Sequence, residues 1–81
     1  MDNDKLILLK ARLYATIRTG SIVAVNGVTV GKYRTAIYDG RGNWAVIDKG
    51  GVQRHVWPQD AVASFLATVG EDAAASALGV K

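Results

Sequence analysis

Apolar residues recur at three- and four-residue steps in the first part of the chain, and this spacing predicts an amphipathic helix over Asp4–Arg18. We expect Asn3 or Asp4 to cap its start, and Gly20 follows its end. Other apolar side chains widen the core-facing stripe, which predicts contacts with more than one neighbouring element. The stripe consists of Leu6, Leu9, Leu13 and Ile17, and the residues that widen it are Ile7, Leu8 and Tyr14.

From Ser21 to Trp57 the apolar period changes to two, which is typical of β-strands. Asn26-Gly27 favours a type I′ hairpin, because both central residues of that turn need a positive φ. Gly31 is expected to be a bulge or a bend. Since every connection is short, we predict a four-stranded antiparallel meander. The segments that build it are Ser21–Val25, then Val28–Val30 and Lys32–Tyr38 on either side of Gly31, then Trp44–Asp48 and Val52–Trp57.

Pro58 ends the last strand and suits the first turn of a helix, where its missing N–H has no partner to lose. Apolar residues at helical spacing then continue to Val69, and Gly70 ends this helix. A short alanine-rich helix follows through Leu78, for which we expect weak docking because alanine buries little area. The chain, residues 1–81, is therefore predicted to be a single α+β domain.

The alternation within the strands predicts a sheet with helices on one side and solvent on the other. No predicted strand is apolar on both faces throughout, and Val52 and Arg54 share one face of the last strand. Two amphipathic helices cannot cover both faces of a four-stranded sheet. We therefore expect the open face, or the loops beside it, to carry the function.

Composition narrows the kinds of chemistry that are available. The 81 residues include no cysteine and one histidine, which excludes a disulfide scaffold, a thiolate metal site and a cysteine nucleophile. An imidazole base would rest on His55 alone, and the acidic residues are scattered, so we predict a non-enzymatic protein without metal or cofactor. No apolar run approaches the roughly 18 residues of a membrane span, and the acidic start is unlike a signal peptide. We expect a cytoplasmic protein with no membrane partner.

Charge is distributed unevenly along the chain, whose formal net charge is +3. Residues 18–57 hold six Lys or Arg against two Asp, whereas residues 58–81 hold one Lys against three acids. The loop from Asp39 to Asn43 is expected to connect two strands, with Arg41 at its tip. Because arginine and aromatic side chains concentrate binding energy at interfaces, the expected partner contacts are Arg34, Tyr38, Arg41, Arg54 and Trp57.

The order of elements along the whole chain is one helix, a meander with tight turns at Asn26-Gly27 and Gly50-Gly51, and a closing helix. This pattern resembles small proteins encoded by phages and other mobile elements, including the anti-CRISPR class. The resemblance covers the chain but has no specific motif, so no family residue is carried over. It implies a compact stoichiometric binder that blocks a host protein or nucleoprotein complex by occupying one of its sites.

Two hypotheses for function remain. The first is an inhibitory or regulatory protein that binds another protein through its sheet face and loops. The second is a nucleic-acid-binding β module, in which a basic sheet face with aromatic side chains stacks bases and neutralises phosphates. Self-association through the edge strand Ser21–Val25 or Val52–Trp57 is also open, so the sequence leaves both the partner and the oligomeric state undetermined.

Overall fold

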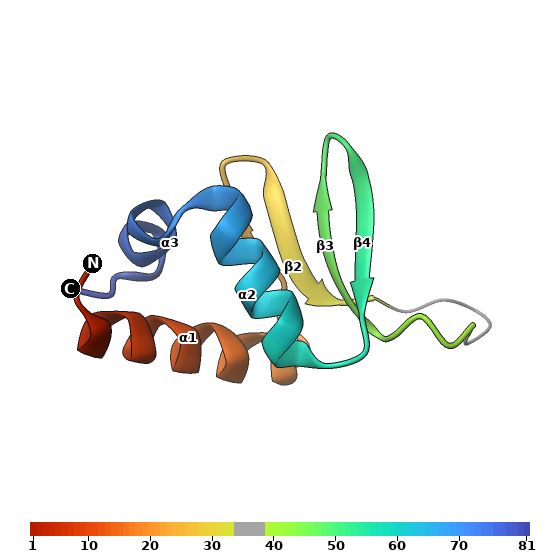
Figure 1. Cartoon of the computed structure of the whole chain (residues 1–81), viewed down its shortest axis with the longest axis horizontal. Helices are drawn as coiled ribbons and strands as arrows, with labels where there is room; N and C mark the ends of the chain where they lie inside the picture. The colour runs from red at the N-terminus through yellow and green to blue at the C-terminus, as the bar shows by residue number, and fades with distance from the viewer. Residues whose placement is uncertain (34–38) are drawn as a thin grey trace.

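The computed structural model describes residues 1–33 and 39–81 and confirms the predicted α+β fold (Figure 1). The strands form one antiparallel sheet in the order β1-β2-β3-β4, which is the predicted meander. Of the predicted strand Lys32–Tyr38, residues 34–38 lie outside the described part of the chain. The elements are α1 (Asn3–Arg18), β1 (Val23–Val25), β2 (Val28–Lys32), β3 (Trp44–Asp48), β4 (Gly51–His55), α2 (Pro58–Val69) and α3 (Glu71–Leu78).

Asp2 caps α1, so the prediction of Asn3 or Asp4 as the cap is wrong. The Asp2 backbone is extended, and its Oδ1 accepts a hydrogen bond of 2.8 Å from the backbone N–H of Lys5. The predicted stripe supplies the buried side of the helix. Two residues expected to widen that stripe remain solvent-exposed, at 58% for Ile7 and 48% for Leu8. The buried residues of α1 are Leu9, Leu13 and Ile17.

β2 continues through Gly31, where the sequence predicts a bulge or a bend. Gly31 pairs with Ala45, and the residues on either side keep consecutive partners in β3. The glycine provides space, because a Cβ at this position would lie 3.0 Å from Cγ1 of Ile22. The hairpin between β1 and β2 forms as predicted, with φ of 52° at Asn26 and 80° at Gly27.

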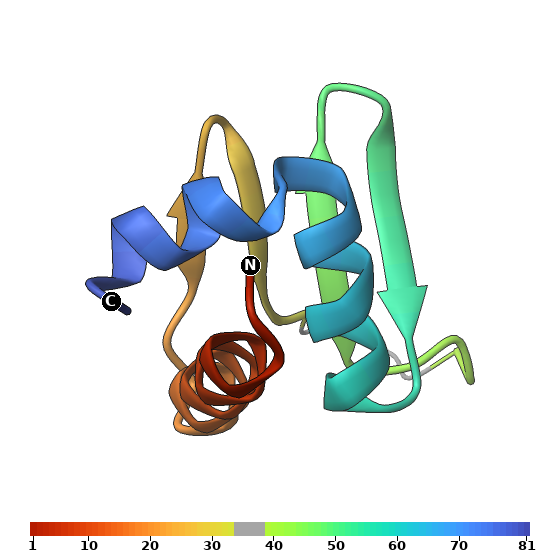
Figure 2. The same ribbon diagram turned by 60° about the vertical axis from the view of Figure 1, so that its left-hand side comes forward.

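All three helices lie on one face of the sheet (Figure 2), which confirms the predicted layer arrangement. α2 packs across β2, β3 and β4, while α1 contacts α2 and the first two strands. Phe65 of α2 is completely buried at the centre of this contact. On β4 the helix-facing side is polar, since Ser64 of α2 and Gln53 share a 2.7 Å hydrogen bond.

α3 packs against the rest of the domain through small side chains. Ala74 and Ala75 are buried, as is Val80 just beyond the helix. Their small side chains let the helix lie close to α1, α2 and β1. Arg12 of α1 donates a 3.0 Å hydrogen bond to the carbonyl of Leu78, which ties down the C-terminal end of α3.

No single helix in residues 1–33 and 39–81 is long and apolar enough to cross a membrane. α2 and α3 reach the length and apolar composition of a membrane span only when taken together, and the pair is bent by 107° where the two helices meet.

Two valines on opposite faces of the sheet test this layer arrangement. We expect Val46→Ala to lower the free energy of unfolding by about 2 kcal/mol or more, because Val46 is 1% exposed under the helices. Val52→Ala, at a residue 47% exposed on the other face, should cost less than about 1 kcal/mol. Chemical denaturation measures both values, and equal losses would contradict a sheet covered on one face.

Candidate functional site

The five expected contact residues divide into three groups. Arg34 and Tyr38 lie outside the described residues. Arg41 and Arg54 meet at the loop after residue 38, where both approach Asp39. Trp57 lies apart from them, at the corner between β4 and α2.

Arg54 holds the loop that leads into β3. Its Nε and Nη2 donate hydrogen bonds of 3.1 and 2.6 Å to the carbonyl of Gly42, and its Nη1 lies 2.7 Å from Oδ2 of Asp39. The guanidinium also stacks 4.8 Å from the ring centre of Tyr33, so its side chain is only 10% exposed. Gly42 has no room for a side chain, because a Cβ would collide with the His55 carbonyl. Contact with a partner stays a prediction for Arg54, whose guanidinium is already engaged within the chain.

Arg41 differs from Arg54 in its exposure. Its backbone N–H donates a 3.1 Å hydrogen bond to Oδ1 of Asp39, whereas its side chain is 78% exposed, with Nε 3.7 Å from Oδ2 of the same carboxylate. An ion pair this exposed contributes little to stability, so the Arg41 side chain can reach a partner at low cost.

The Asp39 carboxylate has a lowered pKa. The hydrogen bond from the Arg41 backbone is the main cause, and the hydrogen bond and charge of Arg54 lower the pKa of Asp39 further, against the desolvation that raises it. The stabilisation that ionised Asp39 gives the folded state is complete above the pKa of Asp in the unfolded chain. It is lost as the pH falls through the lower pKa of the folded state, where Asp39 becomes protonated.

Trp57 is the largest exposed aromatic side chain of the described residues. It is 60% exposed and its neighbour Val56 is 51% exposed. Its backbone is nevertheless fixed, because its carbonyl accepts hydrogen bonds from the N–H groups of Asp60 and Ala61 in the first turn of α2. The buried ring of Pro58 follows directly. The chain therefore presents an anchored tryptophan to solvent.

A hollow of about 430 Å³ opens beside Trp57. Arg18 lines it, with its guanidinium 5.3 Å from the ring centre of Tyr14 and its Nη1 donating to the Tyr14 hydroxyl at 3.0 Å. Lys32 stacks in the same way on Trp44, at 5.6 Å. We call this hollow the Trp57 surface; its lining residues are Tyr14, Arg18, Trp44, Val56, Trp57, Pro58 and Gln59.

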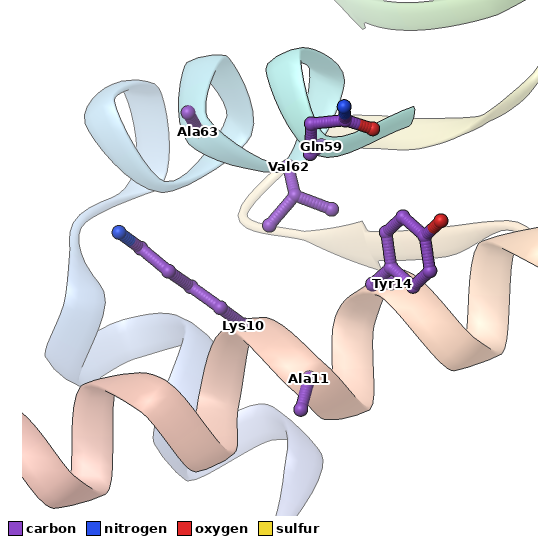
Figure 3. A pocket seen from close by; sticks show the side chains of 6 residues that line it. All are labelled: Lys10, Ala11, Tyr14, Gln59, Val62 and Ala63. Atoms are coloured by element: carbon purple, nitrogen blue, oxygen red, sulfur yellow. The ribbon is translucent and has the colours of Figure 1, made fainter. Parts of the chain in front are cut away.

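A second hollow, of about 400 Å³, lies between α1 and α2 (Figure 3). Val62 points from α2 into the space between Lys10 and Tyr14 of α1. Tyr14 and Gln59 line both hollows, so the second hollow adjoins the Trp57 surface. We call it the α1–α2 groove; its lining residues are Lys10, Ala11, Tyr14, Gln59, Val62 and Ala63.

The open face of the sheet has a different character from the one expected. Ile22 is 66% exposed, Val52 is 47% exposed and Ile47 is 37% exposed, and Ile47 pairs with Val52 across β3 and β4. Trp44 packs on the helix side against the core. Arg54 lies on the same face, but its guanidinium is engaged by Asp39 and Gly42, so the large exposed side chains in the described part of this face are apolar.

Among residues 1–33 and 39–81, no group of three His, Cys, Asp or Glu side chains is placed to hold a metal ion. Nε2 of His55 is buried and has no hydrogen-bond partner in that part of the chain. His55 pairs with Trp44 across β3 and β4.

Comparison of the chain with protein-family models, with curated proteins and with solved structures gives no match. The resemblance to small phage proteins therefore stays an expectation.

Sequence reasoning missed the helical half of the site. Tyr14, Arg18 and Gln59 come from two helices that are about 40 residues apart in the chain and meet only in the folded protein. A signal existed in α1, where Tyr14 and Arg18 are four residues apart and so lie on one side of the helix.

Two arginine variants test the contacts of Arg41 and Arg54 with Asp39. The quantity measured is the pKa of Asp39, obtained from its carboxyl ¹³C shift against pH. Arg54→Lys should raise this pKa toward its ordinary value, because lysine cannot reproduce the forked contacts to Asp39 and Gly42. Arg41→Ala keeps the backbone donor and removes only the weakest of the lowering effects, so it should raise the pKa less. The reverse order would contradict this account.

Proposed function

We propose that the chain is a small, non-enzymatic inhibitor or regulator that binds another protein through the Trp57 surface. The exposure of Trp57, 60% on an anchored backbone, is the observation that carries this proposal. Burying a tryptophan side chain in a partner removes a large apolar area from water. Because the main chain at Trp57 is already ordered, little further backbone entropy is lost on binding.

The neighbours of Trp57 support contact with a protein. Val56 extends the apolar area, while Arg18 and Tyr14 add a charged donor and a hydroxyl at its edge. Tryptophan, tyrosine and arginine are the residues most enriched among the energetic centres of protein interfaces. The hollow also gives a partner side chain a concave place to enter.

The class of partner comes from the whole-chain resemblance to small phage and anti-CRISPR proteins. That resemblance favours a host protein or nucleoprotein complex that is blocked in a one-to-one complex. The Trp57 surface, rather than the open sheet face, is our choice for the blocking contact, because it combines apolar and cationic side chains.

Nucleic-acid binding is the second candidate, and it is favoured by two cations stacked on aromatic rings, Arg18 on Tyr14 and Lys32 on Trp44. A salt titration with a fluorescent single-stranded oligonucleotide separates the two candidates. A steep loss of affinity with increasing salt would support this candidate, and no binding at low salt would remove it.

Trp57→Ala tests the first proposal. The tagged wild-type chain is used to isolate a partner from the native host, and the partner is identified by mass spectrometry and then titrated calorimetrically. We expect Trp57→Ala to weaken binding about 30-fold or more, the size of effect that removing an energetic centre of an interface has. The fold should be retained, because the side chain is largely exposed and makes no capping hydrogen bond.

Val52→Ala is the matched control, since it truncates an exposed apolar side chain on the open face of the sheet. It should leave the affinity within about twofold. Equal affinities of wild type and Trp57→Ala for the isolated partner would reject the Trp57 surface as the contact.

A further inference from the structure

The α1–α2 groove has an apolar floor and lies next to the Trp57 surface. Ala11 and Ala63 are small and exposed on opposite walls, with Val62 between them. Ile7 precedes Ala11 by four residues and Lys10 by three, so it lies on the same side of α1, and it is 58% exposed. Exposed apolar side chains thus stand at both ends of the groove, Ile7 at one and Trp57 at the other.

The charged residues that line the two hollows are both cations. Lys10 and Arg18 come from α1, and neither has a carboxylate within 4.0 Å in residues 1–33 and 39–81. The acidic residue of α2 is Asp60. It lies four residues before Ser64, whose hydroxyl contacts β4, so the turn of the helix directs Asp60 to that side. The groove therefore has a positive edge above an apolar floor.

We infer that the α1–α2 groove takes an acidic, amphipathic helical segment of a protein partner. The small side chains of Ala11 and Ala63 allow a third helix to approach closely, and apolar residues on one side of that helix would pack against these alanines and the ring of Tyr14. Carboxylates at its edge would pair with Lys10 and Arg18. This inference rests on the proposed protein-binding function and specifies the partner element that is recognised.

The geometry of α1 sets the size and charge spacing of that segment. Ile7 and Arg18 are separated by about 16 Å along the helix axis, which is three turns. Lys10 and Arg18 are about 12 Å apart along the same axis, so carboxylates seven or eight residues apart on the bound helix would reach both. A segment of about 12 residues satisfies both requirements.

Three synthetic helical peptides of 14 residues test this inference by ¹H–¹⁵N correlation spectra of the labelled full chain. The first has leucines at helical spacing and two glutamates seven residues apart, the second replaces both glutamates with lysine, and the third scrambles the first. We expect the acidic peptide to shift the amides of Ala11, Tyr14 and Ala63 with a dissociation constant below about 1 mM. The other two peptides should bind at least tenfold more weakly, and raising the salt from about 20 to 300 mM should weaken the acidic peptide.

Ala11→Glu and Ala15→Glu form a matched pair, because both add one negative charge at an exposed alanine of α1. Ala11 lines the groove, whereas Ala15 is not among the residues that line it or the Trp57 surface. Ala11→Glu should weaken the acidic peptide at least tenfold and Ala15→Glu by no more than about twofold. Circular dichroism checks that both variants keep the helical content of the wild type.

The outcomes separate this inference from the proposed function. Loss of host-partner binding in Trp57→Ala but not in Ala11→Glu would overturn the groove inference and leave the Trp57 contact standing. Retained binding in both variants would overturn both. Equal binding of the lysine peptide, shifts confined to the open face of the sheet, or absence of binding by the acidic peptide would each overturn the groove inference. Displacement of the peptide by a single-stranded oligonucleotide would overturn it in favour of nucleic acid.

Discussion

The packing of α2 across β2, β3 and β4 is the contact on which the rest of the structure depends. Phe65 is fully enclosed there, and α1 and α3 then pack against the sides of α2. An 81-residue chain has enough apolar side chains to complete one such layer. The uncovered face, with Ile22, Ile47 and Val52 in contact with solvent, follows directly from that limit.

The same contact explains where the candidate site lies. Pro58 must begin α2 immediately after β4 for the helix to fold back across the sheet, and this sharp return leaves Val56 and Trp57 outside the core. The C-terminal end of α1 comes to the same corner and adds Arg18 and Tyr14. The site is thus a consequence of how a strand turns into a helix, and its side chains come from α1, β3, the corner and α2.

Sequence reasoning recovered the features that depend on neighbours in the chain. The bounds of β3 and α3, the Asn26-Gly27 turn and the buried stripe of α1 depend on local spacing, and the structure reproduces them. It failed where distant segments decide the outcome. The role of Gly31 depends on Ile22 lying over it, and the burial of Ala74 and Ala75 depends on the contacts of α3 with α1, α2 and β1. The contacts of Arg54 with Asp39 and Gly42 depend on three-dimensional proximity that no single segment encodes, as does the meeting of the two hollows at Tyr14 and Gln59.

The bond from Arg12 to the end of α3 also determines how the molecule can be attached to something else. It holds the end of α3 against α1; Asp2 and Lys81 line one shallow depression, and both termini lie at the same end of the molecule (Figure 1). Trp57 shares a hollow with Arg18 at the opposite end of α1, about 24 Å from its start along a 16-residue helix. A chain tethered at either terminus to a surface, a fusion partner or a fluorophore would therefore point its tryptophan corner away from the attachment.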